Sequence, residues 1–220
     1  AFRISLDKCL NLGYPRNAIL TWPKEQVLAF VEKYEPQETL QLIWHMEQYK
    51  KVFIYMPTWR DSQREIFTQQ FDLYALNEIL AAQNALILLK PHPNTHTDEI
   101  IGYSNIVLVK GTTDVYGILP FTDVLITDYS SILYDYLLMK GKETVLFLYD
   151  YEEYVRDRDF YYPFDENVVG KKVTTFTQLL RVISSGDYTT PEKEKQRIVD
   201  KFWGQTMNMN TCEEILKRVC

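Results

Sequence analysis

The stretch LITDYSSILYDYLLMKGK, residues 125–142, passes from an apolar run through two serines into a helical pattern. The apolar run predicts a buried strand over 123–127. The apolar spacing after the serines predicts a helix over 130–140, which Gly141 ends as a C-terminal cap. Because a strand that leads straight into a helix is the repeating unit of α/β proteins, this stretch indicates an α/β fold with a parallel sheet.

The two serines, Ser130 and Ser131, lie where the predicted strand gives way to the predicted helix. A helix N-terminus has unpaired backbone N–H groups and a partial positive charge, so hydroxyl groups there either cap the helix or help it to bind an anion. Capping is the more common role, because nearly every helix needs a cap and few helices bind phosphate. The stretch alone leaves both interpretations open.

Further short apolar runs continue this pattern along the chain. Their hydrophobicity is nearly continuous, which is typical of parallel strands that are covered on both faces. The order of the runs predicts an α/β, Rossmann-like domain, in which a parallel sheet has helices on both faces. The predicted strands lie at 52–56, 85–89, 105–109, 123–127 and 144–148, with helices between them near 62–83, 97–102, 112–120 and 130–140.

Helical patterns flank the predicted sheet on both sides. Residues 1–50 form an N-terminal flanking arm, which is either the domain's own flank or part of a neighbouring domain. Residues 51–220 form the Rossmann-like domain, in which the tyrosine-rich segment 149–170 is expected to be a long loop with one helical turn. The flanking helices are predicted near 24–34, 37–50, 175–185 and 191–203, and from about 211.

Composition and absent motifs exclude several classes of protein. The formal net charge of −6 argues against a nucleic-acid partner, because duplex binding needs a basic face that displaces counterions. The three cysteines have no metal-binding spacing and indicate reduced thiols in a cytoplasmic protein. No apolar run approaches the roughly 20 residues of a membrane span. Neither GxGxxG nor GxxxxGK[ST] occurs, so the sequence predicts no dinucleotide cofactor and no P-loop. No DxD-like pair follows a predicted strand and no EF-hand loop occurs, so the sequence predicts no obligate metal.

Polar and cationic residues follow each of the five predicted strands. Ligands of open parallel sheets collect at the carboxyl ends of the strands, so we expect these residues to converge on one edge. The alternatives are a weak surface pair for Arg60 with Asp61, and a structural turn for His92 between two prolines. The set comprises Thr58, Arg60, Asp61, Lys90, His92, Lys110, Gly111, Thr112, Asp128, Ser130, Ser131, Asp150, Arg156 and Arg158.

Five motifs follow one another along the chain: GYPRN (13–17), YMPTWRD (55–61), KPHP (90–93), LITDYSSILYDYLL (125–138) and LYDYEEY (148–154). Together they resemble the CDP-glycerol glycerophosphotransferases, the bacterial family of teichoic-acid polymerases and primases. The resemblance implies one half of a GT-B-type enzyme. Such an enzyme transfers a polyol phosphate, here glycerol phosphate, from a CDP-activated donor to a hydroxyl of a growing cell-surface polymer and releases CMP.

The resemblance also implies roles for individual residues. His92 would contact the donor's pyrophosphate and stabilise charge on the departing phosphate, as the catalytic residue of this chain. Ser130 and Ser131 would hold the phosphates at the helix start. The substrate-binding set is Arg60, Lys90, Thr127, Asp128, Ser130, Ser131, Arg156 and Arg158.

The chain departs from the family pattern at several places: Val169-Gly170 replaces the usual Pro-Gly, GQTMNMNT (204–211) replaces an acidic-Gly helix start, and two further departures concern the site. The family usually has an Arg-Gly pair where this chain has Arg158-Asp159, which leaves open whether Arg156 or Arg158 contacts phosphate. The family's other essential histidine belongs to a Trp-His-Gly motif ahead of GYPR, whereas Trp44-His45 follows GYPRN, so His45 is not that base. We therefore expect a donor-binding half with little turnover, whose base lies on a domain outside this chain.

The expected partners are CDP-glycerol or a related CDP-polyol donor, and a polymer or lipid-linked acceptor bound by the other domain. The expected location is cytoplasmic, with the full-length enzyme peripheral at the cytoplasmic face of the membrane. Two alternatives remain. One is a nucleotide-sugar glycosyltransferase of the GT-B fold, and the other is a non-catalytic nucleotide-binding or interaction domain that uses the tyrosine-rich segment as its partner surface.

Overall fold

The computed structural model describes residues 4–58, 71–91, 100, 102–158, 160–204, 206 and 210–219. The predicted helix near 97–102 lies almost entirely outside these residues, as does the first part of the one near 62–83. Three residues of the predicted strand-exit set, Arg60, Asp61 and His92, also lie outside them.

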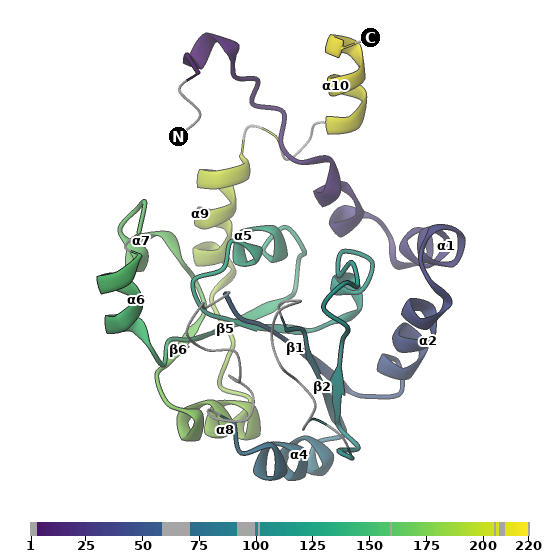
Figure 1. The fold of residues 1–220 in the computed structure, drawn as a ribbon, viewed down its shortest axis with the longest axis vertical. Helices are drawn as coiled ribbons and strands as arrows, with labels where there is room; N and C mark the ends of the chain where they lie inside the picture. The colour runs from purple at the N-terminus through teal and green to yellow at the C-terminus, as the bar shows by residue number, and fades with distance from the viewer. Residues whose placement is uncertain are drawn as a thin grey trace.

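The described strands form one parallel sheet in the order β3-β2-β1-β4-β5-β6 (Figure 1). All five predicted apolar runs are strands of this sheet, which confirms the α/β class. β6 was not predicted, because two of its three residues are lysines and it lacks an apolar run. The strands are β1 (Lys51–Met56), β2 (Ala85–Leu89), β3 (Ile106–Leu108), β4 (Val124–Thr127), β5 (Glu143–Phe147) and β6 (Lys171–Val173).

Helices cover both faces of the sheet (Figure 1). Three of the described helices are short 3-10 helices: η1 (Leu6–Lys8), η2 (Pro15–Thr21) and η3 (Leu119–Phe121). The described α-helices are α1 (Lys24–Tyr34), α2 (Gln37–Met46), α4 (Leu73–Ala82), α5 (Ile132–Tyr136), α6 (Tyr151–Asp157), α7 (Phe164–Asn167), α8 (Phe176–Ser185), α9 (Glu192–Trp203) and α10 (Thr211–Val219).

Successive residues of each strand point to opposite faces of the sheet, and both faces are buried. On one face, Phe53 and Tyr55 of β1 belong to a core with α4 and α8. On the other face, Val52 and Ile54 belong to a core with α1 and α2. These four side chains are at most 3% exposed, which explains the nearly continuous hydrophobicity of the strand.

The N-terminal helices pack as part of this sheet domain. Val27 and Val31 of α1, with Ile43 and Met46 of α2, lie in the same core as β1 and are at most 1% exposed. Of the two alternatives for the N-terminal arm, this packing favours the domain's own flank. The division of the chain at residue 50 stays a prediction.

Some predicted elements differ in the structure. Residues 112–120 form turns and the start of η3 instead of an α-helix, because Gly117 approaches Val31 closely and Pro120 limits the backbone. α5 ends at Tyr136, and turns lead from there to Gly141, whose φ is +73°. The expected loop 149–170 contains the helices α6 and α7. In the part of the chain that the structure describes, no helix is long and apolar enough to cross a membrane.

The close approach of Gly170 to Thr144 yields a test of the fold. Gly170 has a φ of +136°, and a Cβ there would lie 2.7 Å from the backbone oxygen of Thr144. We expect Gly170→Ala to lower the free energy of unfolding by about 2–4 kcal/mol, because both the backbone conformation and the backbone contact oppose a side chain. Urea unfolding measures the loss.

Gly186→Ala is the matched control for this substitution. Gly186 has a φ of +73°, but a Cβ there would meet nothing within 4 Å. Its replacement should therefore cost only about 1 kcal/mol, from backbone conformation alone. Equal losses for the two variants would show that the contact with Thr144 does not constrain residue 170.

Candidate functional site

β1 and β4 are parallel neighbours in the sheet, so their carboxyl ends lie side by side. The strand order reverses between them, and open α/β sheets bind ligands at such a switch point. Asp128 directly follows β4 and is 1% exposed. Its carboxylate accepts hydrogen bonds from the Thr58 N–H (2.9 Å), the Thr58 hydroxyl (2.6 Å) and the Tyr129 N–H (2.6 Å). The buried Thr127 donates its hydroxyl to the Met56 carbonyl at 2.7 Å. These bonds lock the two strand ends together.

Thr127 and Asp128 both belong to the predicted substrate-binding set. Both lie at the carboxyl end of β4, where their polar atoms hold β4 against the end of β1. These bonds fix the point from which the serine stretch starts. Their direct contact with substrate stays a prediction.

Ser130 and Ser131 follow this floor immediately before α5. Ser131 occupies the N-cap position with a helical backbone (φ −64°, ψ −14°), and its side chain makes no capping hydrogen bond. Ser130 Oγ accepts from the Ile132 N–H at 3.5 Å, a distance at the outer limit of a hydrogen bond. Ser131 is exposed and Ser130 is half-buried. Capping therefore does not account for Ser131, and its hydroxyl is accessible to a ligand.

The tyrosine-rich segment packs against this stretch through an aromatic cluster. Tyr129 stacks on Tyr154, with ring centres 4.0 Å apart, and donates its hydroxyl to Asp150 Oδ1 at 3.2 Å. A cavity of about 200 Å³ lies between the cluster and the serine stretch, with Asp128 and Ser130 in its lining. The aromatic cluster comprises Tyr129, Tyr151, Tyr154, Phe160 and Phe164.

Arg156 and Arg158 are exposed on α6 and at its end. Arg156 Nε lies 3.2 Å from Asp157 Oδ1, and both side chains of this ion pair are exposed to solvent. Arg156 lines a different cavity, of about 660 Å³, together with Asp150 and Lys172. The structure thus does not bring Arg156 into the cavity that Ser130 lines. Which of the two arginines contacts phosphate remains open.

Lys90 directly follows β2, and its ammonium donates a hydrogen bond to the Gly111 carbonyl at 2.5 Å. Burial lowers the pKa of Lys90, although the charge of Asp114 opposes this change. Lys90 therefore holds the loop that follows β3, and its contact with a ligand stays a prediction. Among the described residues, no group of three or more His, Cys, Asp and Glu is placed to hold a metal ion.

The sequence analysis missed a polar network that joins the GYPRN and LITDYSSILYDYLL motifs. Asp135 of α5 accepts hydrogen bonds from Arg16 Nη2 (3.1 Å), Asn17 Nδ2 (2.9 Å) and the Tyr116 hydroxyl (2.5 Å). Burial lowers the pKa of Arg16, but its interactions with Tyr116 and Asp135 outweigh burial and hold the pKa above its ordinary value. The sequence offered one signal for this network, an arginine in the first motif and an aspartate in the second. Because 119 positions separate Arg16 from Asp135, the sequence did not show that they pair.

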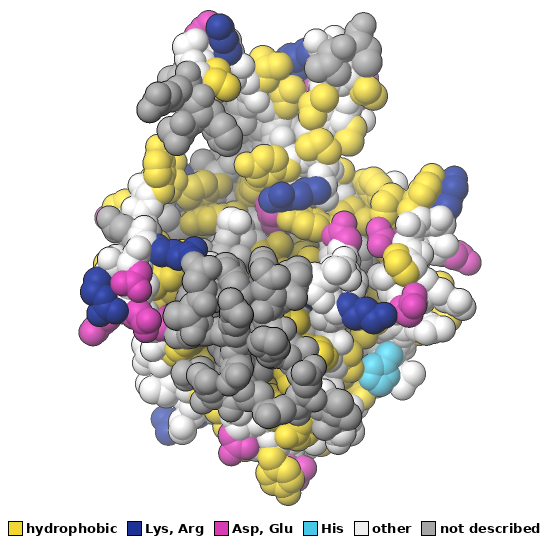
Figure 2. Space-filling model, viewed as in Figure 1, with side chains coloured by type: hydrophobic (Ala, Val, Ile, Leu, Met, Phe, Trp, Pro, Cys, Tyr) yellow, Lys and Arg dark blue, Asp and Glu magenta, His cyan; other side chains and the backbone are white. Residues whose placement is uncertain are grey.

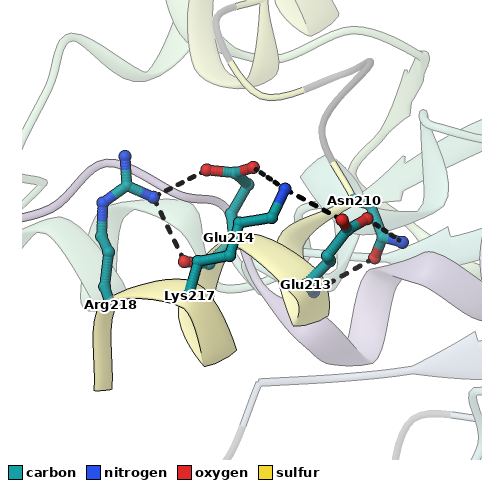
Figure 3. A network of polar contacts seen from close by, with 5 residues as sticks. All are labelled: Asn210, Glu213, Glu214, Lys217 and Arg218. Carbon is teal, nitrogen blue, oxygen red and sulfur yellow. Dashed lines mark hydrogen bonds and ion pairs between the residues drawn. The ribbon is translucent and has the colours of Figure 1, made fainter. Parts of the chain in front are cut away.

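The basic residues near the C-terminus are paired within α10 (Figure 3). Lys217 Nζ lies 2.9 Å from Glu213 Oε1, and Arg218 Nη1 lies 2.8 Å from Glu214 Oε2. Hydrogen bonds from Arg218 and Lys217 lower the pKa of Glu214. α10 therefore carries charges of both signs, which pair with each other along the helix.

The whole chain, residues 1–220, matches the model of a family described as CDP-Glycerol:Poly(glycerophosphate) glycerophosphotransferase. Teichoic acid ribitol-phosphate polymerase TarK of Staphylococcus aureus is 31% identical over 194 residues, which cover 86% of this chain and 36% of TarK. A teichoic acid poly(glycerol phosphate) polymerase of Staphylococcus epidermidis is 29% identical over 213 residues, which cover 92% of this chain and 28% of that protein. The chain therefore spans about a third of the length of these curated relatives.

Solved structures of the wall teichoic acid polymerase TagF share the fold. One superposes with a TM-score of 0.69 and 27% identity, and the match covers 98% of this chain and 55% of TagF. A TagF variant soaked with CDPG superposes with a TM-score of 0.70 and 26% identity, over 98% of this chain and 55% of that one. These matches agree with the parallel six-stranded sheet described above.

The different settings of Asp128 and Ser131 lead to opposite expectations for stability. Asp128→Ala removes the acceptor of three hydrogen bonds and leaves their donors unsatisfied, so we expect a loss of about 3–4 kcal/mol in the free energy of unfolding. Ser131→Ala should change it by less than about 0.5 kcal/mol, because the hydroxyl is exposed and caps nothing. Urea denaturation measures both variants. A loss of about 1 kcal/mol or more for Ser131→Ala would support the capping interpretation instead.

Proposed function

The chain belongs to the CDP-Glycerol:Poly(glycerophosphate) glycerophosphotransferase family, and from that premise we propose that it is the donor-binding half of a polyol-phosphate transferase. Its donor is CDP-glycerol or a related CDP-polyol, and the products are a cell-surface polymer longer by one polyol phosphate and CMP. The family description supports glycerol phosphate as the transferred group. The relatives include polymerases of both glycerol phosphate and ribitol phosphate, which supports a polyol phosphate in general.

One observation carries this proposal: the Ser131 hydroxyl is exposed, and caps nothing, at the switch point of the sheet. Donor phosphates bound here would receive hydrogen bonds from Ser130 and Ser131. Thr127 and Asp128 would act from below, by holding the strand ends from which the serine stretch begins. A diphosphate also needs positive charge, which we assign to Arg60, Lys90 and Arg156 or Arg158.

In the proposed reaction, an acceptor hydroxyl attacks the donor phosphorus that carries the polyol. A new O–P bond forms, the O–P bond to CMP breaks, and the electron pair of that bond leaves on the CMP phosphate. A base on a part of the enzyme outside this chain takes the proton of the acceptor hydroxyl. His92 would contact the pyrophosphate and stabilise the charge that develops on the leaving group. Catalysis would therefore consist mainly of positioning and charge stabilisation.

The remaining parts of the proposal concern the complete enzyme. Its acceptor would be a growing polymer or a lipid-linked primer, bound by the domain that carries the base. We place this enzyme in the cytoplasm, peripheral to the inner face of the membrane. The chain alone should bind donor with little turnover.

Calorimetric titration with CDP-glycerol, CDP and UDP tests the proposed function. We expect the chain to bind CDP and CDP-glycerol more tightly than UDP. Ser130→Ala should weaken the binding of CDP-glycerol by about tenfold, because a hydrogen bond to a charged group is lost. Ser184→Ala is the matched control, since Ser184 is exposed on α8 and its hydroxyl donates a local hydrogen bond to the Arg181 carbonyl.

Each other outcome of this titration identifies a different function. UDP that outcompetes CDP would indicate a nucleotide-sugar transferase. An absence of binding to all three nucleotides would indicate an interaction domain. Binding that is indifferent to both Ser130→Ala and Ser131→Ala would place the phosphate site elsewhere on the chain.

A further inference from the structure

β3 forms one edge of the described sheet, because it pairs with β2 and with no other described strand. On its inner side, the Val109 N–H directly after β3 donates to the Leu89 carbonyl at 2.9 Å. Backbone groups alternate in direction along a strand, so Ile106 and Leu108 direct their N–H and C=O groups away from β2. Within the described part of the chain, these outward groups have no hydrogen-bond partner. Such an edge can accept a further strand.

A groove of about 500 Å³ lies at this edge. Val107 and Leu108 of β3 line it on one side, and both are half-buried. Pro36, between α1 and α2, and Leu42 of α2 also line it. The edge strand therefore borders a partly apolar groove, which gives an added strand a surface for its side chains.

Negative charge is in excess in this groove. Its described lining carries three carboxylates and one ammonium group, which belong to Glu35, Glu38, Asp114 and Lys110. Neither Glu35 nor Glu38 has an ion pair or a side-chain hydrogen bond among the described residues. Burial and the charge of Asp114 raise the pKa of Glu35, which shows that these acids lack a full counter-charge. Acidic side chains lie on the side of the molecule that carries α1 and α2 (Figure 2).

The opposite edge of the sheet differs in its charges. On β6, Lys171 Nζ lies 2.5 Å from Asp187 Oδ2, and Lys172 Nζ lies 2.6 Å from Asp165 Oδ1. The lysines of that edge thus have their counter-charges within the chain. At β3 the counter-charge is open to an external ligand.

We propose that the edge of β3 binds an extended, basic segment of another polypeptide, which joins the sheet as a further strand. The backbone of this segment bonds to the outward groups of Ile106 and Leu108. Side chains alternate along a strand, so a Lys or Arg at every second position reaches Glu35 and Glu38. The aliphatic stems of these side chains pack on Leu42. The inference goes beyond the proposed function, because β2 separates β3 from the switch point between β1 and β4.

A short blocked peptide in which lysine alternates with valine tests the inference by calorimetric titration of the wild-type chain. We expect micromolar binding that weakens as salt is added, because charge pairs contribute to it. The same peptide with glutamate in place of lysine should not bind. An absence of binding by the lysine peptide at about 1 mM overturns the inference, as does equal binding by the glutamate peptide.

Backbone methylation of the lysine peptide tests whether it binds as a strand. One version is N-methylated at its lysines and the other at its valines, so one of them blocks the N–H groups that face β3. That version should bind about tenfold more weakly than the parent peptide, because it loses backbone hydrogen bonds. Two methylated versions that bind as tightly as the parent overturn the inference.

Substitutions in the groove test the role of its charge. Glu35→Gln combined with Glu38→Gln should weaken the lysine peptide by about tenfold, because two charge pairs are lost. Glu25→Gln combined with Glu194→Gln is the matched control, since it changes the net charge equally at exposed positions outside the groove lining. This control should keep the wild-type affinity. Equal losses in the two double variants would show an effect of net charge alone and overturn the inference.

Amide NMR signals of the wild-type chain locate the bound peptide. The N–H signals of Ile106 and Leu108 should shift and exchange more slowly with solvent when the lysine peptide is added, because these groups become hydrogen-bonded. The signal of Lys172, on the other edge of the sheet, should stay in place. Shifts elsewhere with none on β3 overturn the inference. Titration with CDP-glycerol decides the proposed function separately, so either can fail while the other stands.

Discussion

The buried carboxylate of Asp128 connects two strand ends that are 70 residues apart in the chain. The strand order reverses between β1 and β4, so a crevice opens where these strands end. An unpaired carboxylate there would carry a large desolvation cost, but each bond to Thr58 and Tyr129 satisfies it. The serine stretch, α5 and the aromatic cluster all begin next to this residue. Their positions therefore depend on it.

Much of the fold could be predicted because parallel strands buried on both faces have almost continuous apolar runs. Phe53 and Ile54 face two different cores, and no alternation marks the strand as half-exposed. The pattern failed where packing overrides local preference. Residues 112–120 have helix-like spacing, but the contact of Gly117 with Val31 and the ring of Pro120 favour turns. β6 is held mainly by its pairing with β5, and a three-residue run with two lysines does not reveal that.

The site was predictable only in part. The position of Ser130 and Ser131 between a strand and a helix could be predicted because a strand exit and a helix start coincide in one short stretch. Spacing could not show that Thr127 and Asp128 turn inward, because that depends on the partners that β1 offers. The pairing of Arg16 with Asp135 joins segments 119 residues apart, and periodicity carries no record of which loops meet. A single sequence therefore identifies the residue types of a site more readily than their orientation.

The short helix α5 joins the serine stretch to the N-terminal part of the chain. Its first turn follows directly from Ser131, and its buried Asp135 holds Arg16. Since four helical residues rise by about 6 Å, the distance between the hydroxyl and the anchor of the guanidinium is set by helix pitch. The helix therefore fixes this distance. A shift of α5 would carry the serine stretch and, through Asp135, the segment of Arg16 and Asn17 along with it.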